Sequence, residues 1–527
     1  MEQRCLIVGG GTMGSGIALV AARGGYRVEV VEPLPAARER ALTYFERETQ
    51  RAEDGAVLER IVWLDALPQS SDAALAIEAV PEQFDLKRDV FIALARAIAP
   101  DALLATNTSS FSVSALADVV DRSDRVVGLH FFNPPARMAL LEIIGAPQTS
   151  DEMLERAFAV AERLGKTGVL ASDTPGFIVN RVARPFYLNA MRALEEEIAS
   201  AEELDALARG AGFRMGPFEL MDLIGLDVNL ATTESIYART GAPRFAPVEL
   251  QRRMVAQGLL GRKTGAGFYN YRDGSPERYD AGVPEQTERN SDEFVALLGF
   301  GPRADELAEL LEQQYANLQR IENDELIDEL SPRTTLVIDA GDGVEDRGEV
   351  IAGLDSVLGV ESVFFADAYT TDLERCARRM QHPERLIGYG VLGELQSQDV
   401  VEIVDSDQVA DDALELAQEL FATLGKGAVL VEDSPGLFLG RTIGSIVNEA
   451  MIAIAEDVAS PDDIDVAMRL GANYPIGPVA WGREIGGARI ARILQRVADA
   501  HGDAFAPHRS LWMLDLPPNP EEEEAAQ

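Results

Sequence analysis

The residue of this chain best suited to acid–base chemistry is His130, which stands at the end of a short apolar run. An imidazole, with an ordinary pKa of about 6.5, can accept the proton of a hydroxyl group at neutral pH. Glu142 lies in the next apolar run, and its carboxylate could orient the ring and stabilise its protonated form. Taken alone, His130 is also compatible with a strand-end histidine that only bonds to the backbone.

A glycine-rich turn joins the first predicted strand to a helix. Gly9 allows a tight turn, Gly11 lets the backbone approach a pyrophosphate, and Gly14 lets the helix lie close on the strand. The helix N-terminus then faces the phosphates. A second strand ends at Glu32, where an acid holds a ribose 2′-OH and repels a 2′-phosphate. The pattern predicts an NAD site, and its alternative is an ordinary strand–turn–helix corner.

Other polar side chains follow neighbouring predicted strands. Ligands of open α/β sheets bind beyond the carboxyl ends of the strands, so residues there are candidates for ligand contact. A dinucleotide and a base suit the oxidation of a secondary alcohol, in which a base takes the hydroxyl proton while hydride leaves carbon. Besides His130, the residues that follow strands are Glu32, Glu82, Asn107 and Ser109.

The elements that position these residues alternate in type over residues 1–150, which predicts a doubly wound, Rossmann-type α/β domain. Residues 151–275 read as an all-α helical domain. Residues 276–332 read as a helical connector, with a long exposed helix over 305–327. The predicted strands are 4–8, 28–31, 75–79, 102–106, 125–129 and 140–144, and the predicted helices are 14–24, 34–50, 85–98 and 113–119.

The rest of the chain repeats the first part at an offset of 260 to 261 residues, which implies an internal duplication. Glu142 is echoed by Glu402, and Gly176 by Gly436. We expect a truncated, degenerate Rossmann-like copy over 333–432, a second helical domain over 433–515 and an acidic tail over 516–527. Its first recognisable strand, 335–338, matches the strand before Glu82. The loop that follows holds acids that would repel a pyrophosphate: Asp339, Asp342, Glu345 and Asp346.

Composition narrows the class of protein. The net charge of −41 argues against nucleic acid or anionic membranes as partners, since both require basic patches. No apolar run approaches a membrane span of roughly 18 residues, and nothing resembles a signal peptide. Two cysteines, Cys5 and Cys376, argue against a disulfide framework. We expect a cytoplasmic protein without a metal site. The acidic surface is either a salt adaptation or a reflection of genome composition.

Several segments, in their order and spacing, resemble the L-3-hydroxyacyl-CoA dehydrogenase family. The resemblance covers residues 1 to about 272. The whole chain resembles the long bacterial form of the family, which has a duplicated C-terminal part and serves aromatic and fatty acid breakdown. The segments are 9–16 (GGGTMGSG), 107–110 (NTSS), 128–134 (GLHFFNP), 141–144 (LEII), 175–181 (PGFIVNR) and 261–269 (GRKTGAGFY).

The resemblance implies NAD-dependent oxidation of a (3S)-hydroxyacyl-CoA to a 3-oxoacyl-CoA. It makes His130 the general base and Glu142 its partner, with Ser109 and Asn180 orienting the substrate. Each role has a structural alternative. Ser109 could cap a helix, Asn180 could lie on a polar helix face, and Lys87 and Lys263 could be ordinary surface lysines. The implied cofactor-binding residues are Gly9, Gly11, Thr12, Met13, Gly14, Glu32, Glu82, Lys87, Asn107, Ser109, Asn133 and Lys263.

Two features depart from the family pattern. Family members grip the CoA phosphates with a serine and a lysine on the helix after Glu32, whereas this helix carries arginines that could replace the lysine, namely Arg38, Arg40 and Arg47. In the second copy, the counterparts of Ser109, His130, Asn133 and Asn180 are Tyr369, Gly390, Gly393 and Gly440.

The second copy is therefore expected to be a packing partner without catalytic function. A duplicated helical domain could form a pseudo-dimer within one chain, and the alternative is a homodimer. Two other functions stay open: a dehydrogenase of a free hydroxy acid such as a sugar acid, and a non-catalytic NAD-binding protein.

Overall fold

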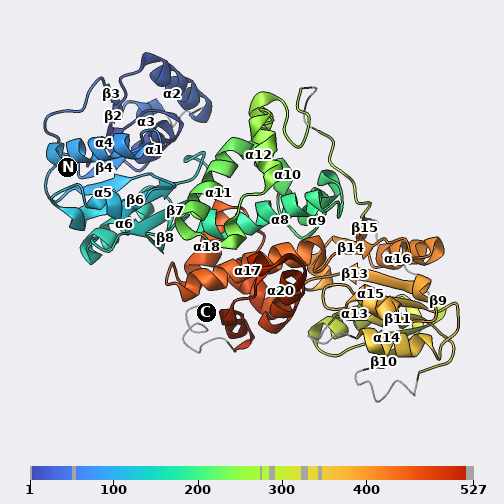
Figure 1. The fold of residues 1–527 in the computed structure, drawn as a ribbon. Coiled ribbons are helices and arrows are strands. Elements are labelled where there is room, and N and C mark those ends of the chain that lie inside the picture. Colours follow the sequence, from blue (N-terminus) through green and yellow to red (C-terminus); the bar gives the residue numbers. More distant parts are fainter. Residues whose placement is uncertain are drawn as a thin grey trace. The chain divides into compact units, whose positions relative to one another are not determined.

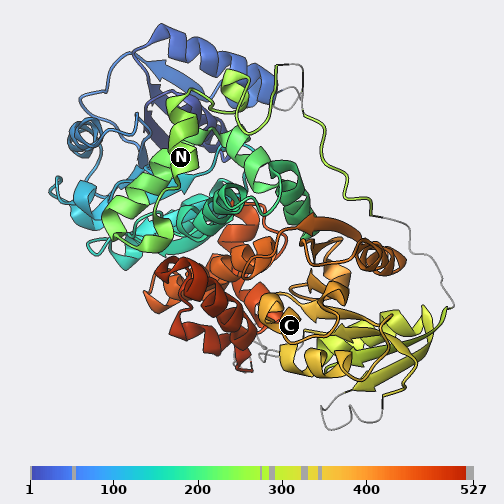
Figure 2. The same cartoon turned by 45° about the vertical axis from the view of Figure 1, so that its right-hand side comes forward.

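The computed structural model describes residues 3–49, 55–272, 274, 276–283, 291–321, 330–341 and 347–517. Asp342, Glu345, Asp346 and residues 518–527 of the expected acidic tail lie outside the described residues. The chain divides into two compact units, the first made of residues 1–182 and 453–473, the second of residues 183–452 and 474–527. Figures 1 and 2 show the elements of each unit.

The first unit is built on a doubly wound sheet. In the part of the chain that the structure describes, its eight strands run in the order β3-β2-β1-β4-β5-β6-β7-β8. Neighbouring strands are parallel except β6 and β7. The order reverses between β1 and β4, which is where such sheets bind ligands. The strands are β1 Arg4–Val8, β2 Arg27–Val31, β3 Ile61–Leu64, β4 Leu75–Glu78, β5 Leu103–Thr106, β6 Val126–Phe131, β7 Leu140–Gly145 and β8 Thr167–Ser172.

Helices pack on this sheet and bury its strands. Strands β4, β5 and β6 are buried at every residue, as expected for a parallel sheet covered on both faces. Their sequences are accordingly continuous apolar runs, which is why the sequence pattern finds them. The helices of this unit are α1 Thr12–Arg23, α2 Pro35–Glu48, α3 Gly55–Leu58, α4 Phe84–Ala97, α5 Val113–Ala117, α6 Asp151–Arg163, α7 Val179–Val182 and α18 Pro461–Gly471, with the 3-10 turn η2 Ser123–Arg125.

The sequence pattern misses two strands of this sheet. Strand β3 is apolar but has only four residues, lies at the edge of the sheet and is only partly buried. Strand β8 alternates between exposed and buried residues and begins and ends with polar ones, so it forms no continuous apolar run. The predicted boundary at residue 150 is therefore wrong for the sheet, because β8 at Thr167–Ser172 belongs to it.

The second unit contains the second sheet, and its first elements correct the prediction of a helical connector. Residues 291–321 form a strand, a helix and a parallel strand (β9, α13 and β10), not a connector with one long helix. The apolar end of β9 runs into Gly299, whose φ is +132°, and α13 follows at once. The second copy thus begins with its own strand–turn–helix. The charged residues of α13 and β10 hide this division in the sequence.

The second sheet repeats the order of the first. Its seven strands, counted over the described residues, run β10-β9-β11-β12-β13-β14-β15. Among these residues, the second sheet has no counterpart of β3. The pair β13 and β14 is antiparallel, like β6 and β7. The strands are β9 Ser291–Leu298, β10 Tyr315–Ile321, β11 Thr334–Asp339, β12 Val363–Asp367, β13 Leu386–Gly390, β14 Val400–Val404 and β15 Gly427–Val431.

The remaining elements of the second unit are helical. Its α-helices are α8 Arg184–Glu195, α9 Ala201–Gly210, α10 Pro217–Ile224, α11 Leu226–Thr240, α12 Glu249–Ala256, α13 Pro302–Glu312, α14 Gly348–Asp355, α15 Leu373–Ala377, α16 Asp411–Thr423, α17 Leu437–Ala455, α19 Pro478–Ile485 and α20 Gly487–His501. Its 3-10 turns are η3 Pro243–Phe245, η4 Arg262–Thr264, η6 Pro383–Arg385, η7 Leu395–Ser397, η8 Asp503–Phe505 and η9 Arg509–Asp515.

Helix α17 has the length and apolar composition of a membrane span, although no apolar run of that length is expected from the sequence. Arg441 and Glu449 interrupt the apolar sequence of this continuous helix, and 89% of its apolar window is buried inside the protein. A buried helix of this kind is the core helix of a helical domain.

The two copies exchange helices. In the first unit, α18 from the second copy packs on β7 and β8 of the first. There Ser172 N donates to Val458 O at 2.8 Å, and a Cβ on Gly471 would lie 2.6 Å from the Leu140 side chain. The second unit holds the reciprocal arrangement, in which α9 of the first copy packs on β14 of the second. Glu432 N donates to Ile198 O at 2.9 Å there. Each copy therefore supplies a helix that packs on the other copy's sheet.

Candidate active site

His130 and Glu142 face each other across the antiparallel pair of strands. They are direct partners in the register of β6 and β7, and His130 Nδ1 lies 2.5 Å from Glu142 Oε2. Both side chains are buried, Glu142 completely. Because Nδ1 is bonded to the carboxylate, proton exchange with a substrate falls to Nε2.

A strained turn fixes the other oxygen of Glu142. Glu142 Oε1 accepts hydrogen bonds from Ile178 N at 3.1 Å and Val179 N at 2.9 Å. The chain turns into α7 through Gly176 and Phe177, whose φ angles are +83° and +48°. A positive φ is unfavourable for phenylalanine, and such strain gathers at functional sites. The turn aims two N–H groups at the carboxylate and so holds the partner of His130 in place.

Two aromatic rings enclose the imidazole, and sequence reasoning missed both. The centroid of the His130 ring lies 4.7 Å from that of Phe132 and 5.6 Å from that of Phe177. Both residues stand within motifs that the sequence singled out, at positions next to named site residues. Their rings confine the imidazole to one orientation.

Ser109 lies in a loop after β5 that Glu82 organises. Glu82 Oε1 accepts hydrogen bonds from Ser109 N at 3.1 Å, Ser110 N at 3.0 Å and Thr108 Oγ1 at 2.6 Å. Burial raises the pKa of Glu82, but the Lys87 ammonium and the hydroxyl groups of Thr108 and Ser110 outweigh it, so the net pKa is lowered. An ionised Glu82 thus shapes the loop that carries Ser109.

Lys87 is buried and does not lie at the surface. It is 1% exposed, and its ammonium contacts Glu78 Oε1 at 2.8 Å, Glu82 Oε2 at 3.0 Å and Val80 O at 3.2 Å. An ammonium has three N–H groups, and these three acceptors use them. Lys87 is therefore placed to act on the site through Glu82.

The predicted asparagines lie at three different places around the histidine. Asn107 Oδ1 accepts a hydrogen bond from Phe131 N at 2.9 Å, which ties the loop after β5 to the strand of His130. Asn133 is exposed just beyond that strand. Asn180 stands in α7, directly after the N–H groups that hold Glu142.

The glycine-rich turn has the geometry that a pyrophosphate requires. A Cβ on Gly9 would lie 2.5 Å from Ala79 O, and one on Gly14 would lie 1.8 Å from Gly9 O, so both positions demand glycine. A Cβ on Gly11 would meet no described atom within 4 Å, which leaves open space where phosphates would bind. Thr12 and Met13 open helix α1 beside this space.

Glu32 is held at the end of β2, ready to face a ribose. Its carboxylate accepts hydrogen bonds from Gly10 N at 2.9 Å and Leu34 N at 3.0 Å. Arg38 bonds to the carbonyl oxygens of Glu32 and Leu64 and to Asp65, so its guanidinium is engaged at the strand ends. Of the arginines that could replace the CoA-binding lysine, Arg40 and Arg47 are the exposed ones.

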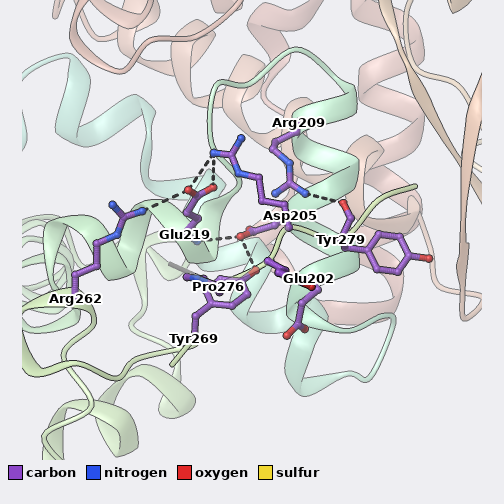
Figure 3. Close-up of a pocket in the computed structure, with 10 residues that line it drawn as sticks. Glu202, Asp205, Arg209, Glu219, Arg262, Tyr269, Pro276 and Tyr279 are labelled. Carbon is purple, nitrogen blue, oxygen red and sulfur yellow. Dashed lines mark hydrogen bonds and ion pairs between the residues drawn. The ribbon is translucent and has the colours of Figure 1, made fainter. Parts of the chain in front are cut away.

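Lys263 belongs to the second unit, where its ammonium contacts Asp227. The segment 261–269, which contains Lys263, is bonded to helix α10, because the N–H groups of Phe268 and Tyr269 donate to Asp222 at 3.0 and 2.9 Å. Arg262 and Tyr269 of the same motif line a cavity of about 330 Å³ (Figure 3). Glu219 pairs with Arg262 and Arg278 in its wall, and the Tyr269 hydroxyl donates to Asp205 at 2.7 Å. These paired charges form a structural network.

Profiles of two domains each match the chain twice. The profile described as 3-hydroxyacyl-CoA dehydrogenase, NAD binding domain, matches residues 4–174 and 303–434. The profile described as 3-hydroxyacyl-CoA dehydrogenase, C-terminal domain, matches residues 176–271 and 436–524. The chain belongs to the 3-hydroxyacyl-CoA dehydrogenase family. The predicted family, Rossmann-type fold, internal duplication and NAD cofactor are thereby confirmed, and the chain is an oxidoreductase.

Relatives span the whole dehydrogenase chain or its first half. The 3-hydroxyadipyl-CoA dehydrogenase of Escherichia coli K12 is 35% identical over 95% of this chain and 94% of its own. The mitochondrial hydroxyacyl-coenzyme A dehydrogenase of Sus scrofa is 38% identical over 50% of this chain and 90% of its own. The crystal structure of 3-hydroxybutyryl-CoA dehydrogenase from E. coli K12 superposes with a TM-score of 0.74 at 32% identity, covering 97% of this chain and 98% of that one.

In the second copy of the dehydrogenase fold, a tyrosine fills the site. Tyr369, the counterpart of Ser109, donates its hydroxyl to Glu402 Oε2 at 2.6 Å, so it takes the role of the missing histidine. A Cβ on Gly390 would lie 2.9 Å from the Tyr369 ring, and one on Gly440 would lie 2.8 Å from it. The two glycines that replace His130 and Asn180 thus make room for the ring.

The surviving carboxylate of the second copy anchors a helix. Glu402 Oε1 accepts a hydrogen bond from Phe438 N at 2.7 Å, at the start of α17, as Glu142 does at α7. Arg303, at the start of α13, donates to the carbonyl oxygens of Val391 and Gly393 and closes the edge where a dinucleotide would lie. The residues of the second copy that correspond to the predicted site thus contact one another and the start of α17.

Proposed function

We propose that this dehydrogenase oxidises (3S)-hydroxyacyl-CoA thioesters to 3-oxoacyl-CoA, with His130 as the general base. The observation that carries the proposal is the buried His130–Glu142 pair, in which Nδ1 is engaged and Nε2 is left for proton transfer. His130 Nε2 takes the C3 hydroxyl proton while hydride leaves C3, and Glu142 stabilises the imidazolium that forms.

The residues around the glycine-rich turn fit NAD. Gly11 leaves space for a pyrophosphate, and Glu32 offers a carboxylate to the ribose hydroxyls. When bound, the nicotinamide supplies the hydride acceptor. Ser109 and Asn180 would orient the substrate oxygen toward His130, with the loop of Ser109 held by Glu82.

The first test is NADH formation with 3-hydroxybutyryl-CoA, 3-hydroxyadipyl-CoA and free 3-hydroxybutyrate. The two thioesters follow the names of the relatives. Turnover of thioesters only supports the proposal, and the ratio of the two rates identifies the acyl group. Turnover of the free acid only would mean that the enzyme is a dehydrogenase of free hydroxy acids.

The His130→Gln variant separates an enzyme from a binding protein. The proposal expects kcat to fall about 10²–10⁴-fold, the usual contribution of a general base. NADH binding, measured by fluorescence titration, should change less than about twofold. Unchanged turnover in this variant would contradict the role of His130.

We infer further that the second copy supplies within the chain the contacts that a second subunit would otherwise provide. The reciprocal packing of α18 on the first sheet and of α9 on the second supports this inference. Sedimentation equilibrium at working concentration should then give the mass of one chain, 57.1 kDa. A mass of two chains would favour the homodimer.

A further inference from the structure

A buried carboxylate at the end of β4 has no part in the reaction so far described. Glu78 is completely buried and lies at the switch point of the first sheet, opposite Val8 in the register of β1 and β4. Its Oε1 accepts hydrogen bonds from Val80 N and from Lys87 Nζ, both at 2.8 Å. A buried charge is costly unless it is paired and fully bonded, so Glu78 must stabilise something specific.

One route from Glu78 leads to the loop of Ser109 through charge. The Lys87 ammonium lies between the carboxylates of Glu78 and Glu82, at 2.8 and 3.0 Å. Glu82 in turn accepts the N–H groups of Ser109 and Ser110. The buried cation therefore transmits the position of Glu78 to the carboxylate that shapes this loop.

A second route leads to the same loop through a hydroxyl group. Thr106 Oγ1 donates to Glu78 Oε2 at 2.7 Å and accepts a hydrogen bond from Thr108 N at 3.2 Å. Asn107, between these threonines, accepts the N–H of Phe131, the residue after His130. Both oxygens of Glu78 are thus connected to the segment 106–110, which carries Ser109 and is bonded through Asn107 to the strand of His130.

We propose that Glu78 is a positioning residue, which acts through Lys87 and Thr106 to hold Ser109 at a fixed place relative to His130. The proposal rests on the proposed roles of Ser109 and His130 in the oxidation of hydroxyacyl-CoA. It assigns Lys87 to the support of Glu82, because the three N–H groups of its buried ammonium are used within this network.

The decisive experiment is a double-mutant cycle between Glu78→Gln and Ser109→Ala, measured as kcat/KM for the thioester that the enzyme turns over. Glutamine keeps the volume of the side chain but removes the charge that Lys87 and Thr106 contact. In the wild-type background Glu78→Gln should lower kcat/KM about tenfold. In the Ser109→Ala background it should lower kcat/KM less than about twofold, because the group that it positions is gone. Equal losses in both backgrounds would overturn the proposal.

A second measurement does not depend on turnover. Hydrogen–deuterium exchange of a peptide over 106–112 should become faster in Glu78→Gln, since Ser109 N and Ser110 N are protected by Glu82. Unchanged exchange of this peptide would refute the proposal even if no thioester were a substrate. If the wild-type enzyme turned over no thioester, but exchange of this peptide were faster in Glu78→Gln, the proposed function alone would be refuted.

Two further variants separate positioning from general stability. Thr106→Val removes the hydroxyl route alone, keeps the strand, and should show the same direction of change at a smaller size. Asp339→Asn is the matched control, because Asp339 ends β11 opposite Leu298 in the second copy, as Glu78 ends β4 opposite Val8. It should leave kcat/KM and the exchange of 106–112 unchanged. A tenfold loss in this control would assign the effect of Glu78→Gln to stability.

Discussion

At the scale of single residues, the chemistry of this dehydrogenase depends on what fixes each group. The sequence predicts His130 as the base and Glu142 as its partner, since their types and motifs are distinctive, and the structure brings the two side chains together. It does not identify the N–H groups of Ile178 and Val179 or the rings of Phe132 and Phe177, which act through backbone direction and packing. Backbone N–H groups belong to every residue type except proline, and aromatic rings are common in cores. These supporting groups can therefore be recognised only in the folded structure.

The Glu142→Gln variant should lose most of its activity. Glutamine can still accept the N–H of Val179, but its amide N–H₂ would donate to His130 Nδ1 and leave the ring proton on Nε2. An imidazole in that tautomer cannot take the substrate proton. We expect kcat to fall about 10²–10⁴-fold, as NADH production will measure. Glu402→Gln, the same change in the second copy, is the control and should retain kcat.

At the scale of elements, regular and buried segments are predictable and irregular ones are not. Most strands of the first sheet, and β11 of the second, follow from their apolar runs. Strand β8 and the β9–α13–β10 unit mix polar and apolar residues and escape the pattern, and the apolar β3 escapes it because it is a short edge strand. The opposition of His130 and Glu142 depends on one antiparallel pair in an otherwise parallel sheet. The spacing of twelve residues between His130 and Glu142 does not show that the two strands are antiparallel. A short connection between β6 and β7 only makes an antiparallel pair possible.

The strand β13 should not tolerate a methyl group at Gly390. Its Cβ would lie 2.9 Å from the ring of Tyr369, whose hydroxyl is bonded to Glu402. We expect Gly390→Ala to lower the free energy of unfolding by about 1–3 kcal/mol and to leave kcat per folded molecule unchanged. Urea denaturation measures this. Gly353→Ala in α14 is the control, because a Cβ there meets no described atom within 4 Å.

Two buried carboxyls that anchor helices should make stability depend on pH. Burial raises the pKa of Asp205, in α9, to about 7 and that of Glu402, in β14, to about 7. Asp205 accepts N–H groups at the start of α10, and Glu402 does so at the start of α17. The folded state therefore binds more protons than the unfolded state above pH of about 4, and stability falls as pH rises toward 7. Each group contributes a slope of about 1.4 kcal/mol per pH unit in that window. Glu402→Gln should flatten the profile of denaturation midpoints between pH 5 and 8, and an unchanged slope would contradict this.

At the scale of the whole molecule, charge is the dominant property. Acids outnumber bases by 88 to 47, and such an excess destabilises a compact state through repulsion. The net charge can be predicted directly from the composition, because it is a sum over residues and does not depend on the fold. The duplication was also visible as an offset in the sequence, but the exchange of α9 and α18 was not, since it depends on contacts between distant segments.

Salt should therefore stabilise the protein. Raising NaCl from about 0.05 to 1 M shortens the Debye length to roughly 3 Å and screens the repulsion between surface carboxylates. We expect the thermal midpoint, followed by differential scanning fluorimetry, to rise over this range. A midpoint that falls or stays constant would show that local ion pairs outweigh the net charge.

The exchange of helices has a consequence for synthesis. A ribosome completes β8 at residue 172, but the helix that covers it, α18, begins at residue 461. At about 5–20 residues per second, translation needs roughly 15–60 s to bridge that gap. During this time the nascent chain carries a finished nucleotide-binding sheet with the surface around Leu140 and Val179 uncovered. The order of the two copies along the gene thus sets how long the growing polypeptide must be protected from aggregation.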